Sequence, residues 1–545
     1  MKNFSKIFIA MGLAVLGLSS CTDDLNVTPT DPNVIQEPDL DRSLAGCYQS
    51  LCSPGTGGAD GSPVLQGYDG GMSTFQRAVF CLNELTTDEY VWLSFTDAGY
   101  YSLVTNDFSA NNPIFYGTYS RLYIVVSICN NFLRDVNEGK FAGADAAKVS
   151  EYSRQVRIIR ALAYYYLVDM FGNVGYSDET LTAGVAPGQS TRAEIYNKVV
   201  GELESISAEY GDNTEVVYGY VGKDACDALL AKFYLNAGVF TGTPAWDKCW
   251  DKCEEIIARH RGGGFEQTGL AKHYLNLFGA NNDQYVSGGS NKAENEIIWA
   301  IPQDATYITS YAGSTFMIAA GCANPAASDT WTMTPADYNS TEAWKCMVAR
   351  KQFSEKFTWN GGDSGDERVK LWRTSNHGFT IDNPELSQAT FNYGYANMKF
   401  SNWTYEDDGT KSETQLDATK FSSADYPIIR LADVYLMAAE SAVRSGRDSD
   451  KALEYVNYIR KRANIGSLES TPTLNQIIDE RARELYGENC RRTDLVRFGH
   501  YAGGSYNWNW KGGVAKGQAI ASHMDLFPIP QTIISLQNYN QNAGY

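Results

Sequence analysis

The chain has 545 residues, of which 43% are apolar and 13% aromatic, and its formal net charge is −19. This apolar content is ordinary for a globular protein and argues against a largely disordered chain. The acidic balance argues against binding to nucleic acid, because such a site needs clustered positive charge.

The first twenty residues follow the order of a bacterial lipoprotein signal. A basic start precedes an apolar run over 7–18, and two serines then lead to Cys21. As a helix this run is about 18 Å long, which is too short to span a bilayer. We therefore interpret residues 1–20 as a signal peptide and Cys21 as the lipidation site, whose acyl chains would hold the protein on a membrane.

Residues 21–41 contain three prolines among polar residues and are predicted to form an extended tether. No later stretch contains eighteen consecutive apolar residues, so no transmembrane helix is expected. The rest of the chain, 42–545, is predicted to be a single body.

Paired amphipathic helices are the strongest pattern in the first part of this body. Helical periodicity of the apolar residues predicts helices over 116–136, 147–171 and 224–236. Gly238 is placed to end the last of these. The dipeptide Thr243-Pro244 is a start signal for another helix, and the short connection predicts an antiparallel helix hairpin.

The same pattern returns near the C-terminus. A helical stripe follows Pro427 and is ended by Gly446, after which Ser449 is placed to cap the next helix. Thr473 and Gln476 have the spacing of a capping box at the start of a third helix.

Two segments of similar character support a repeat of helix pairs. Residues 163–167 and 231–235 both combine alanine, aromatic residues and leucine, and they lie 68 positions apart, twice the tetratricopeptide period of about 34 residues. We therefore predict an all-α fold in which tetratricopeptide-like hairpins form a curved stack, with helical pairs over about 42–265 and 425–500.

Between about 266 and 424 the helical pattern is lost. Glycine, asparagine, serine and threonine are frequent, and this segment holds six of the eleven tryptophans: Trp299, Trp331, Trp344, Trp359, Trp372 and Trp403. A long irregular stretch inside a helical protein is usually functional. We predict that this excursion faces the ligand.

The sequence contains no recognisable catalytic or metal-binding motif. The five histidines form no close metal pair, and there is no nucleophile elbow or phosphate-binding loop. Cys249 and Cys253 are interpreted as core residues, and the acidic segment 363–367 as a solvated loop rather than a calcium site. We expect no enzyme activity, cofactor or metal, although sequence alone does not exclude a carboxylate pair of a glycosidase.

Several segments in a fixed order resemble the SusD/RagB family of nutrient-binding lipoproteins. They span the mature chain and are Arg160–Gly172, Arg430–Glu440, Glu480–Glu488, Arg491–Gly499, Leu526–Pro530 and Gln541–Tyr545. Small departures from the family pattern occur at Gly175, Cys490 and Arg492.

The resemblance implies a surface lipoprotein of the cell outer membrane that faces the exterior. It would bind a nutrient, which we expect to be an oligosaccharide, and deliver it to a TonB-dependent SusC-like transporter. The acidic pair Asp23-Asp24 after Cys21 resembles the signal for surface export in such bacteria. A scaffold of this kind could also bind peptides or another nutrient, and a surface glycosidase is the third alternative, because fold does not fix function.

Sugar binding needs aromatic platforms and polar groups that meet hydroxyls. We predict Trp92, Tyr100 and Tyr101 as platforms, because they stand beside aspartates in a probable loop and the family's N-terminal ligand contacts fall in this region. Weaker candidates for hydroxyl contacts are Asp69, Arg368 and Tyr395. Core packing is the competing interpretation of each aromatic residue.

Charged residues of the C-terminal block that resembles the family are interpreted differently. We expect them to form ion pairs that lock the last hairpin rather than a catalytic site, since structural networks also concentrate charge. These residues are Glu480, Arg481, Glu484, Arg492, Asp494 and Arg497.

Overall fold

The computed structural model describes residues 38–55, 57–59, 61, 63–283, 291–324, 333–357, 365–368, 372–373, 396–397 and 399–545. Helix dominates these residues, and each sheet among them has two strands. The all-α class expected from the sequence is therefore confirmed. Cys21, the signal peptide and most of the tether lie outside the described residues. Helix begins at Leu40, so the last two residues of the predicted tether are helical.

The main helices fall into two groups along the chain. The first group is α2 (Leu40–Cys52), α3 (Phe75–Asn83), α5 (Pro113–Asn137), α6 (Ala146–Phe171), α7 (Arg192–Tyr210), α8 (Lys223–Leu235) and α10 (Trp246–His260). The second group is α14 (Leu431–Ser445), α15 (Ser449–Arg462), α16 (Leu474–Leu485), α17 (Arg491–Arg497) and α18 (Gln531–Gln537).

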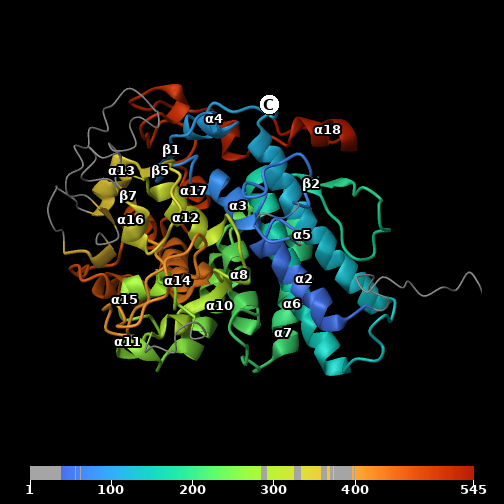
Figure 1. Ribbon diagram of the computed structural model, residues 1–545, viewed down its shortest axis with the longest axis horizontal. Helices are drawn as coiled ribbons and strands as arrows, with labels where there is room; N and C mark the ends of the chain where they lie inside the picture. Colours follow the sequence, from blue (N-terminus) through green and yellow to red (C-terminus); the bar gives the residue numbers. More distant parts are fainter. Residues whose placement is uncertain are drawn as a thin grey trace, which may run out of the picture.

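The two groups form one continuous helical stack. Helix α6 packs between α5 and α7, and α8 packs against α7 and α10. Helix α10 then contacts α14, which also contacts α15 and α16. Figure 1 shows α2, α5, α6 and α7 on one side of the molecule and α14, α15 and α16 on the other, with α8 and α10 between them. The pairs separated in sequence by the excursion are therefore neighbours in space.

Local sequence signals predict most helices correctly, but some predicted ends differ from those in the structure. The capping box of Thr473 and Gln476 is present at the start of α16, and Gly446 ends α14 in the left-handed conformation. Helix α10 begins after Ala245 instead of at Thr243-Pro244, and Asp448 rather than Ser449 caps α15. Gly238 does not end the helical region, because α9 (Ala237–Thr241) follows α8 directly.

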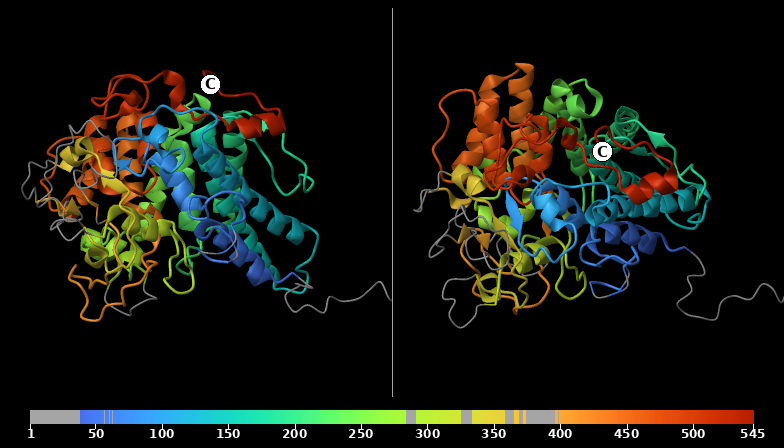
Figure 2. Two further views of the ribbon diagram at one scale, coloured as in Figure 1. Left: turned by 45° about the horizontal axis from the view of Figure 1, so that its top comes forward. Right: turned by 90° about the horizontal axis from the view of Figure 1, so that it is seen from above.

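The excursion contains short elements in its described parts. Its helices and 3-10 turns are α11 (Gly264–Gln267), η2 (Tyr274–Phe278), η3 (Ala293–Asn295), α12 (Gly313–Gly321), η4 (Pro335–Tyr338), α13 (Lys351–Ser354) and η5 (Glu355–Phe357). Outside it lie α4 (Tyr100–Val104), η8 (Lys511–Gly513) and η9 (Ser522–Asp525). Both views of Figure 2 place the yellow and orange excursion on the side away from the cyan α5.

Antiparallel strand pairs fasten this excursion to the helical stack. β1 (Tyr90–Trp92) pairs with β5 (Met347–Ala349), and β4 (Ile297–Ile301) pairs with β8 (Tyr426–Arg430), which leads into α14. The other pairs are β2 (Val174–Gly175) with β3 (Gln189–Ser190) and β6 (Trp372–Arg373) with β7 (Ala396–Asn397). The β1–β5 pair brings the segment after α3 beside the excursion.

The core is continuous through the stack. Cys249 and Cys253 lie in it as buried free thiols, as expected for core residues. In the described part of the chain, no helix has both the length and the apolar character needed to cross a membrane.

Candidate functional site

A buried arginine, Arg77, lies where α3 meets the excursion. The Arg77 guanidinium carbon is 4.9 Å from the ring centroid of Phe316, 5.2 Å from that of Trp344 and 5.7 Å from that of Trp92. Its Nη2 donates a hydrogen bond of 3.3 Å to the Tyr100 hydroxyl. Among the described residues it forms no ion pair, and its buried Nε has no hydrogen-bond partner. The three aromatic rings around the guanidinium compensate part of the cost of burying its charge.

The inner wall of this site is a stack of three rings. The Trp92 ring lies 4.5 Å from Tyr100 on one side and 5.8 Å from Phe316 on the other, with interplanar angles of 20° and 15°. The indole N–H of Trp92 donates a 3.0 Å hydrogen bond to Asp97. Trp92 is therefore enclosed by protein, and the Arg77 guanidinium lies against the Trp92 and Phe316 rings.

Three half-buried rings form the outer rim. The Tyr311 ring centroid is 6.0 Å from that of Trp344 and 5.2 Å from that of Phe421. The Lys420 ammonium lies 4.8 Å from the Tyr311 ring. The indole N–H of Trp344 donates a 2.7 Å hydrogen bond to Glu342 and is held in orientation by it. We call Arg77, Tyr311, Trp344 and Phe421 the aromatic site.

Gly71 allows the loop after α2 to approach this site closely. A Cβ atom on Gly71 would lie 2.8 Å from Nη1 of Arg77, 3.0 Å from Cβ of Tyr311 and 3.3 Å from Oδ1 of Asp69. The exposed Asp69 accepts a 2.8 Å hydrogen bond from the backbone N–H of Met72, which fixes the carboxylate beside the rim. The site thus offers aromatic faces, a cation and a carboxylate within one small region.

The N-terminal candidates from the sequence divide into buried and exposed residues. Trp92 is 1% exposed and Tyr100 fully buried, so their predicted role as platforms is wrong in this structure. The physical reason is that they stack on each other and on Phe316. Tyr101 is 48% exposed and its ring packs edge-on against Phe95, while Asp69 is exposed beside the aromatic site.

The prediction that Arg368 contacts ligand is also wrong, because it is fully buried among carboxylates. It forms ion pairs of 2.8 Å with Asp366 and Glu480 and of 3.3 Å with Glu484. Asp366, expected in a solvated loop, is 2% exposed and belongs to this cluster. Tyr395, like Cys21, lies outside the described residues.

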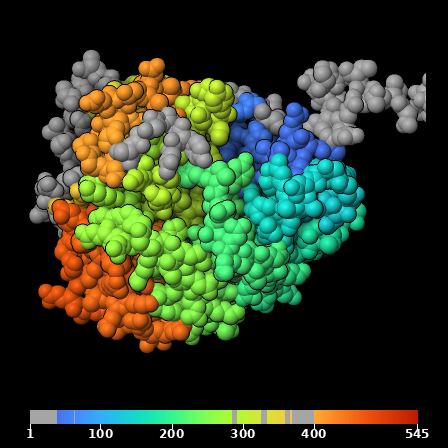
Figure 3. All heavy atoms as spheres, turned by 90° about the horizontal axis from the view of Figure 1, so that it is seen from below, coloured from blue at the N-terminus to red at the C-terminus, as the bar shows by residue number. Residues whose placement is uncertain are grey.

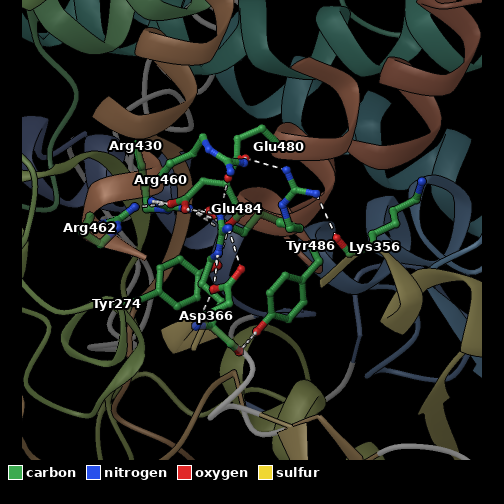
Figure 4. Close-up of polar contacts among 12 residues, drawn as sticks. Tyr274, Lys356, Asp366, Arg430, Arg460, Arg462, Glu480, Glu484 and Tyr486 are labelled. Carbon is green, nitrogen blue, oxygen red and sulfur yellow. Dashed lines mark hydrogen bonds and ion pairs between the residues drawn. The ribbon is translucent and has the colours of Figure 1, made fainter. Parts of the chain in front are cut away.

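Figure 4 shows that this cluster gathers charged groups from several elements between the helical stack and the excursion. Arg430, at the entrance to α14, pairs with Glu296 at 2.6 Å and with Glu488 at 2.7 Å. Arg462 of α15 pairs with Glu296 at 3.0 Å, and Lys399 pairs with Glu488 at 2.6 Å. We call this group the charge cluster, and it ties the excursion to α14, α15 and α16.

The charges of the C-terminal block are structural, as the sequence predicted. Each forms buried ion pairs, which are Arg368–Glu480, Arg462–Glu484, Arg481–Asp433, Arg481–Asp494, Arg492–Asp169, Arg497–Glu440 and Arg497–Asp494. Burial alone would raise the pKa of Glu480, but the guanidinium groups of Arg368 and Arg483 outweigh it and lower this pKa to about 2.

Sequence reasoning missed most of the aromatic site. The sequence identifies Trp344 only as one tryptophan of the excursion, and it gives no signal for Tyr311 or Phe421. Arg77 carried a signal, since it is a charge inside the otherwise apolar or uncharged run 75–83. In the described residues no cluster of histidine, cysteine or carboxylate groups is arranged to hold a metal ion.

Family models match the two halves of the chain. The model described as "SusD family" matches residues 242–545, and the model described as "Starch-binding associating with outer membrane" matches residues 63–235. A curated relative, the starch-binding protein SusD of Bacteroides thetaiotaomicron, is 31% identical over 586 aligned residues, which cover 100% of this chain and 99% of the relative.

Solved structures show the same fold. A SusD superfamily protein from Bacteroides thetaiotaomicron has a TM-score of 0.66 at 19% identity, covering 92% of this chain and 99% of that one. Surface glycan-binding protein A of the same species, solved in complex with laminarihexaose, has a TM-score of 0.63 at 20% identity, covering 92% of this chain and 98% of that one. Together with the full-length match to SusD, these findings establish that the chain belongs to the SusD family.

Proposed function

We propose that this protein binds an oligosaccharide at the aromatic site and delivers it to a TonB-dependent, SusC-like transporter. In this proposal it is an outer-membrane lipoprotein, anchored through Cys21 and facing the exterior, and it has no enzyme activity. The observation that carries the binding function is the half-buried rim of Tyr311, Trp344 and Phe421 around the buried cation of Arg77, with the exposed Asp69 carboxylate nearby.

The chemistry of this rim suits a sugar. A pyranose ring has apolar C–H faces, which stack on aromatic rings, and a rim of hydroxyls, which need donors and acceptors. Arg77 supplies N–H donors, and Asp69 and Glu342 supply carboxylate oxygens near the rings. The relatives support the same ligand class, since one is named a starch-binding protein and another was solved with a bound glucan.

Calorimetry on the purified protein tests the binding function, with soluble starch and laminarihexaose as the probes. We expect one of these glucans to bind, and we expect Trp344→Ala to weaken that binding about tenfold or more, because it removes the apolar face that covers the sugar. The matched control is Trp246→Ala, which removes a partly exposed tryptophan on α10, far from the aromatic site in sequence and packed against Arg444.

The same experiment separates the alternatives. Binding of peptides but not of glycans would replace the oligosaccharide proposal with a peptide-binding one. Release of shorter sugars by the pure protein, abolished by a single carboxylate substitution, would establish a glycosidase. Co-purification of a β-barrel partner with the membrane-bound protein tests the delivery step, and failure to recover one under conditions that preserve such complexes would contradict it.

A further inference from the structure

A cavity separate from the aromatic site lies between α2, the loop before α8 and the segment after β4. Its volume is about 460 Å³. Its walls come from three separate parts of the chain, and the residues that carry the argument are Tyr48, Gly58, Tyr220, Tyr307 and Thr309. We call it the tyrosine cavity. In Figure 3 the blue surface of α2, the green surface near residue 220 and the yellow-green surface near residue 300 meet at a recess on this face.

One wall of the tyrosine cavity is rigid. The Tyr48 hydroxyl donates a 2.8 Å hydrogen bond to Gln155 of α6 and accepts a 2.9 Å bond from the backbone N–H of Val221. The Tyr220 ring packs edge-on against Tyr48, with 5.2 Å between ring centroids and an interplanar angle of 75°. Tyr220 is therefore held by a ring that is itself fixed at both sides, and a ligand would meet a preformed surface.

The mouth of the cavity presents unused aromatic surface. Tyr220 is 44% exposed and Tyr307 is 88% exposed, and neither hydroxyl has a hydrogen-bond partner among the described residues. Val216 and Val217, in the same loop as Tyr220, are also exposed. Large apolar side chains gathered on a surface mark an interaction site, and a tyrosine adds a hydroxyl that can bond to a sugar.

Two chain segments connect this cavity with the aromatic site. The segment that carries Tyr307 and Thr309 continues directly to Tyr311. The loop after α2 follows it closely, since a Cβ atom on Gly58 would lie 2.8 Å from the Thr309 hydroxyl and one on Gly71 would lie 3.0 Å from Cβ of Tyr311. The same two segments therefore border both places.

We propose that the tyrosine cavity is a second sugar-binding subsite, which takes the distal part of a long oligosaccharide whose other part lies on the aromatic site. The proposal rests on the proposed function and adds to it that the protein selects for chain length. Tyr220 and Tyr307 provide the stacking faces, and the Thr309 hydroxyl and the tyrosine hydroxyls meet the sugar hydroxyls. A short oligosaccharide fills the aromatic site alone.

Calorimetry with ligands of two lengths tests this subsite. The probes are maltotriose with maltoheptaose and laminaritriose with laminarihexaose, titrated into the unchanged protein, Tyr307→Ala and the double variant Tyr220→Ala/Tyr307→Ala. For the series that binds, we expect the long sugar to bind the unchanged protein about tenfold more tightly than the short one. The double variant should lose this advantage and keep its affinity for the short sugar, because stacking is lost only at the distal end.

Two further variants make the outcome specific. Leu536→Ala removes another highly exposed apolar side chain, on α18, and should leave both affinities unchanged. Trp344→Ala should weaken the binding of both the short and the long sugar. If the unchanged protein bound the short and the long sugar equally well, the proposed subsite would be wrong. It would also be wrong if the double variant still bound the long sugar more tightly than the short one. Either result would assign the exposed tyrosines to a protein contact and leave the aromatic site unaffected. Absence of binding of any of the four sugars to the unchanged protein would overturn the glucan-binding function as well.

Discussion

Arg368 and Glu480 are 112 positions apart in the chain, yet a guanidinium nitrogen of Arg368 lies 2.8 Å from a carboxylate oxygen of Glu480. Both side chains are almost completely buried, and Figure 4 shows Glu480 among the groups that meet there. The pair joins the excursion to α16, so its contribution is to hold the irregular half of the molecule on the helical stack. Since the excursion also carries Tyr311 and Trp344, this attachment supports the aromatic site.

The first prediction concerns the stability of this attachment. Arg368→Met should lower the free energy of unfolding by about 3–5 kcal/mol, because it removes the buried guanidinium that pairs with Asp366, Glu480 and Glu484. Urea unfolding followed by circular dichroism measures the loss. The control Lys248→Met removes the ion pair of Lys248 with Glu204, which is exposed to water, and should cost about 0–1 kcal/mol. Equal losses in the two variants would refute a supporting role for the charge cluster.

The sequence predicted the helical stack well because its signals are local. The apolar stripe of α14 and the capping box of α16 depend on residues within one or two turns, so they can be recognised without knowledge of the fold. The contact between α10 and α14 was not predictable in this way, because it depends on how the whole excursion between them folds.

The candidate site was harder to predict because burial depends on distant residues. Trp92 looked like a platform in a loop, but Phe316, more than two hundred positions later, covers one of its faces. The sequence around Arg368 does not reveal that Glu480 and Glu484, more than a hundred positions later, form ion pairs with it. The sequence therefore indicates which types of residue form a sugar-binding site, whereas the exposure of each side chain depends on the three-dimensional arrangement.

The second prediction concerns the close approach at Gly71. Gly71→Ala should weaken glucan binding about tenfold, because its Cβ would lie within 3.0 Å of Arg77 and Tyr311 and would displace parts of the aromatic site. The matched control is Gly46→Ala in α2, where a Cβ would meet nothing within 4 Å. This control should bind normally and be more stable by about 0.5–1 kcal/mol, since alanine favours helix. Normal binding by Gly71→Ala would show that this contact does not shape the site.

The third prediction concerns the buried carboxyl pair Glu84 and Glu89. Burial raises the pKa of each, and the negative charge of Glu84 raises the pKa of Glu89 further. A native pKa above the unfolded value means that the folded protein binds the proton more tightly than the unfolded chain. The contribution of this pair to the free energy of unfolding is therefore lost as pH rises from about 4.5 through the raised native pKa. Glu89→Gln keeps an acceptor for the Gly487 N–H and removes one of the two titrating groups.

Urea unfolding at pH 5 and pH 7.5 measures this effect. Relative to the unchanged protein, Glu89→Gln should gain about 1 kcal/mol or more between the two pH values, since one pKa unit corresponds to 1.36 kcal/mol. The control Glu255→Gln alters a carboxylate on α10 whose side chain is half exposed, and its stability difference should be the same at both pH values. A pH-independent difference for Glu89→Gln would contradict a raised native pKa for Glu89.

The last prediction concerns anchoring through Cys21. The basic start, the short apolar run and the serines before Cys21 predict that this cysteine is acylated after cleavage. Since each buried CH₂ contributes about 0.8 kcal/mol, loss of the acyl chains should release the protein from the membrane. Cys21→Ala should therefore move the protein from the membrane fraction to the soluble fraction and abolish labelling by a fatty-acid analogue. Ser19→Ala changes a neighbouring residue without removing the thiol and should leave both unchanged. Continued membrane association and labelling of Cys21→Ala would mean that another residue carries the anchor.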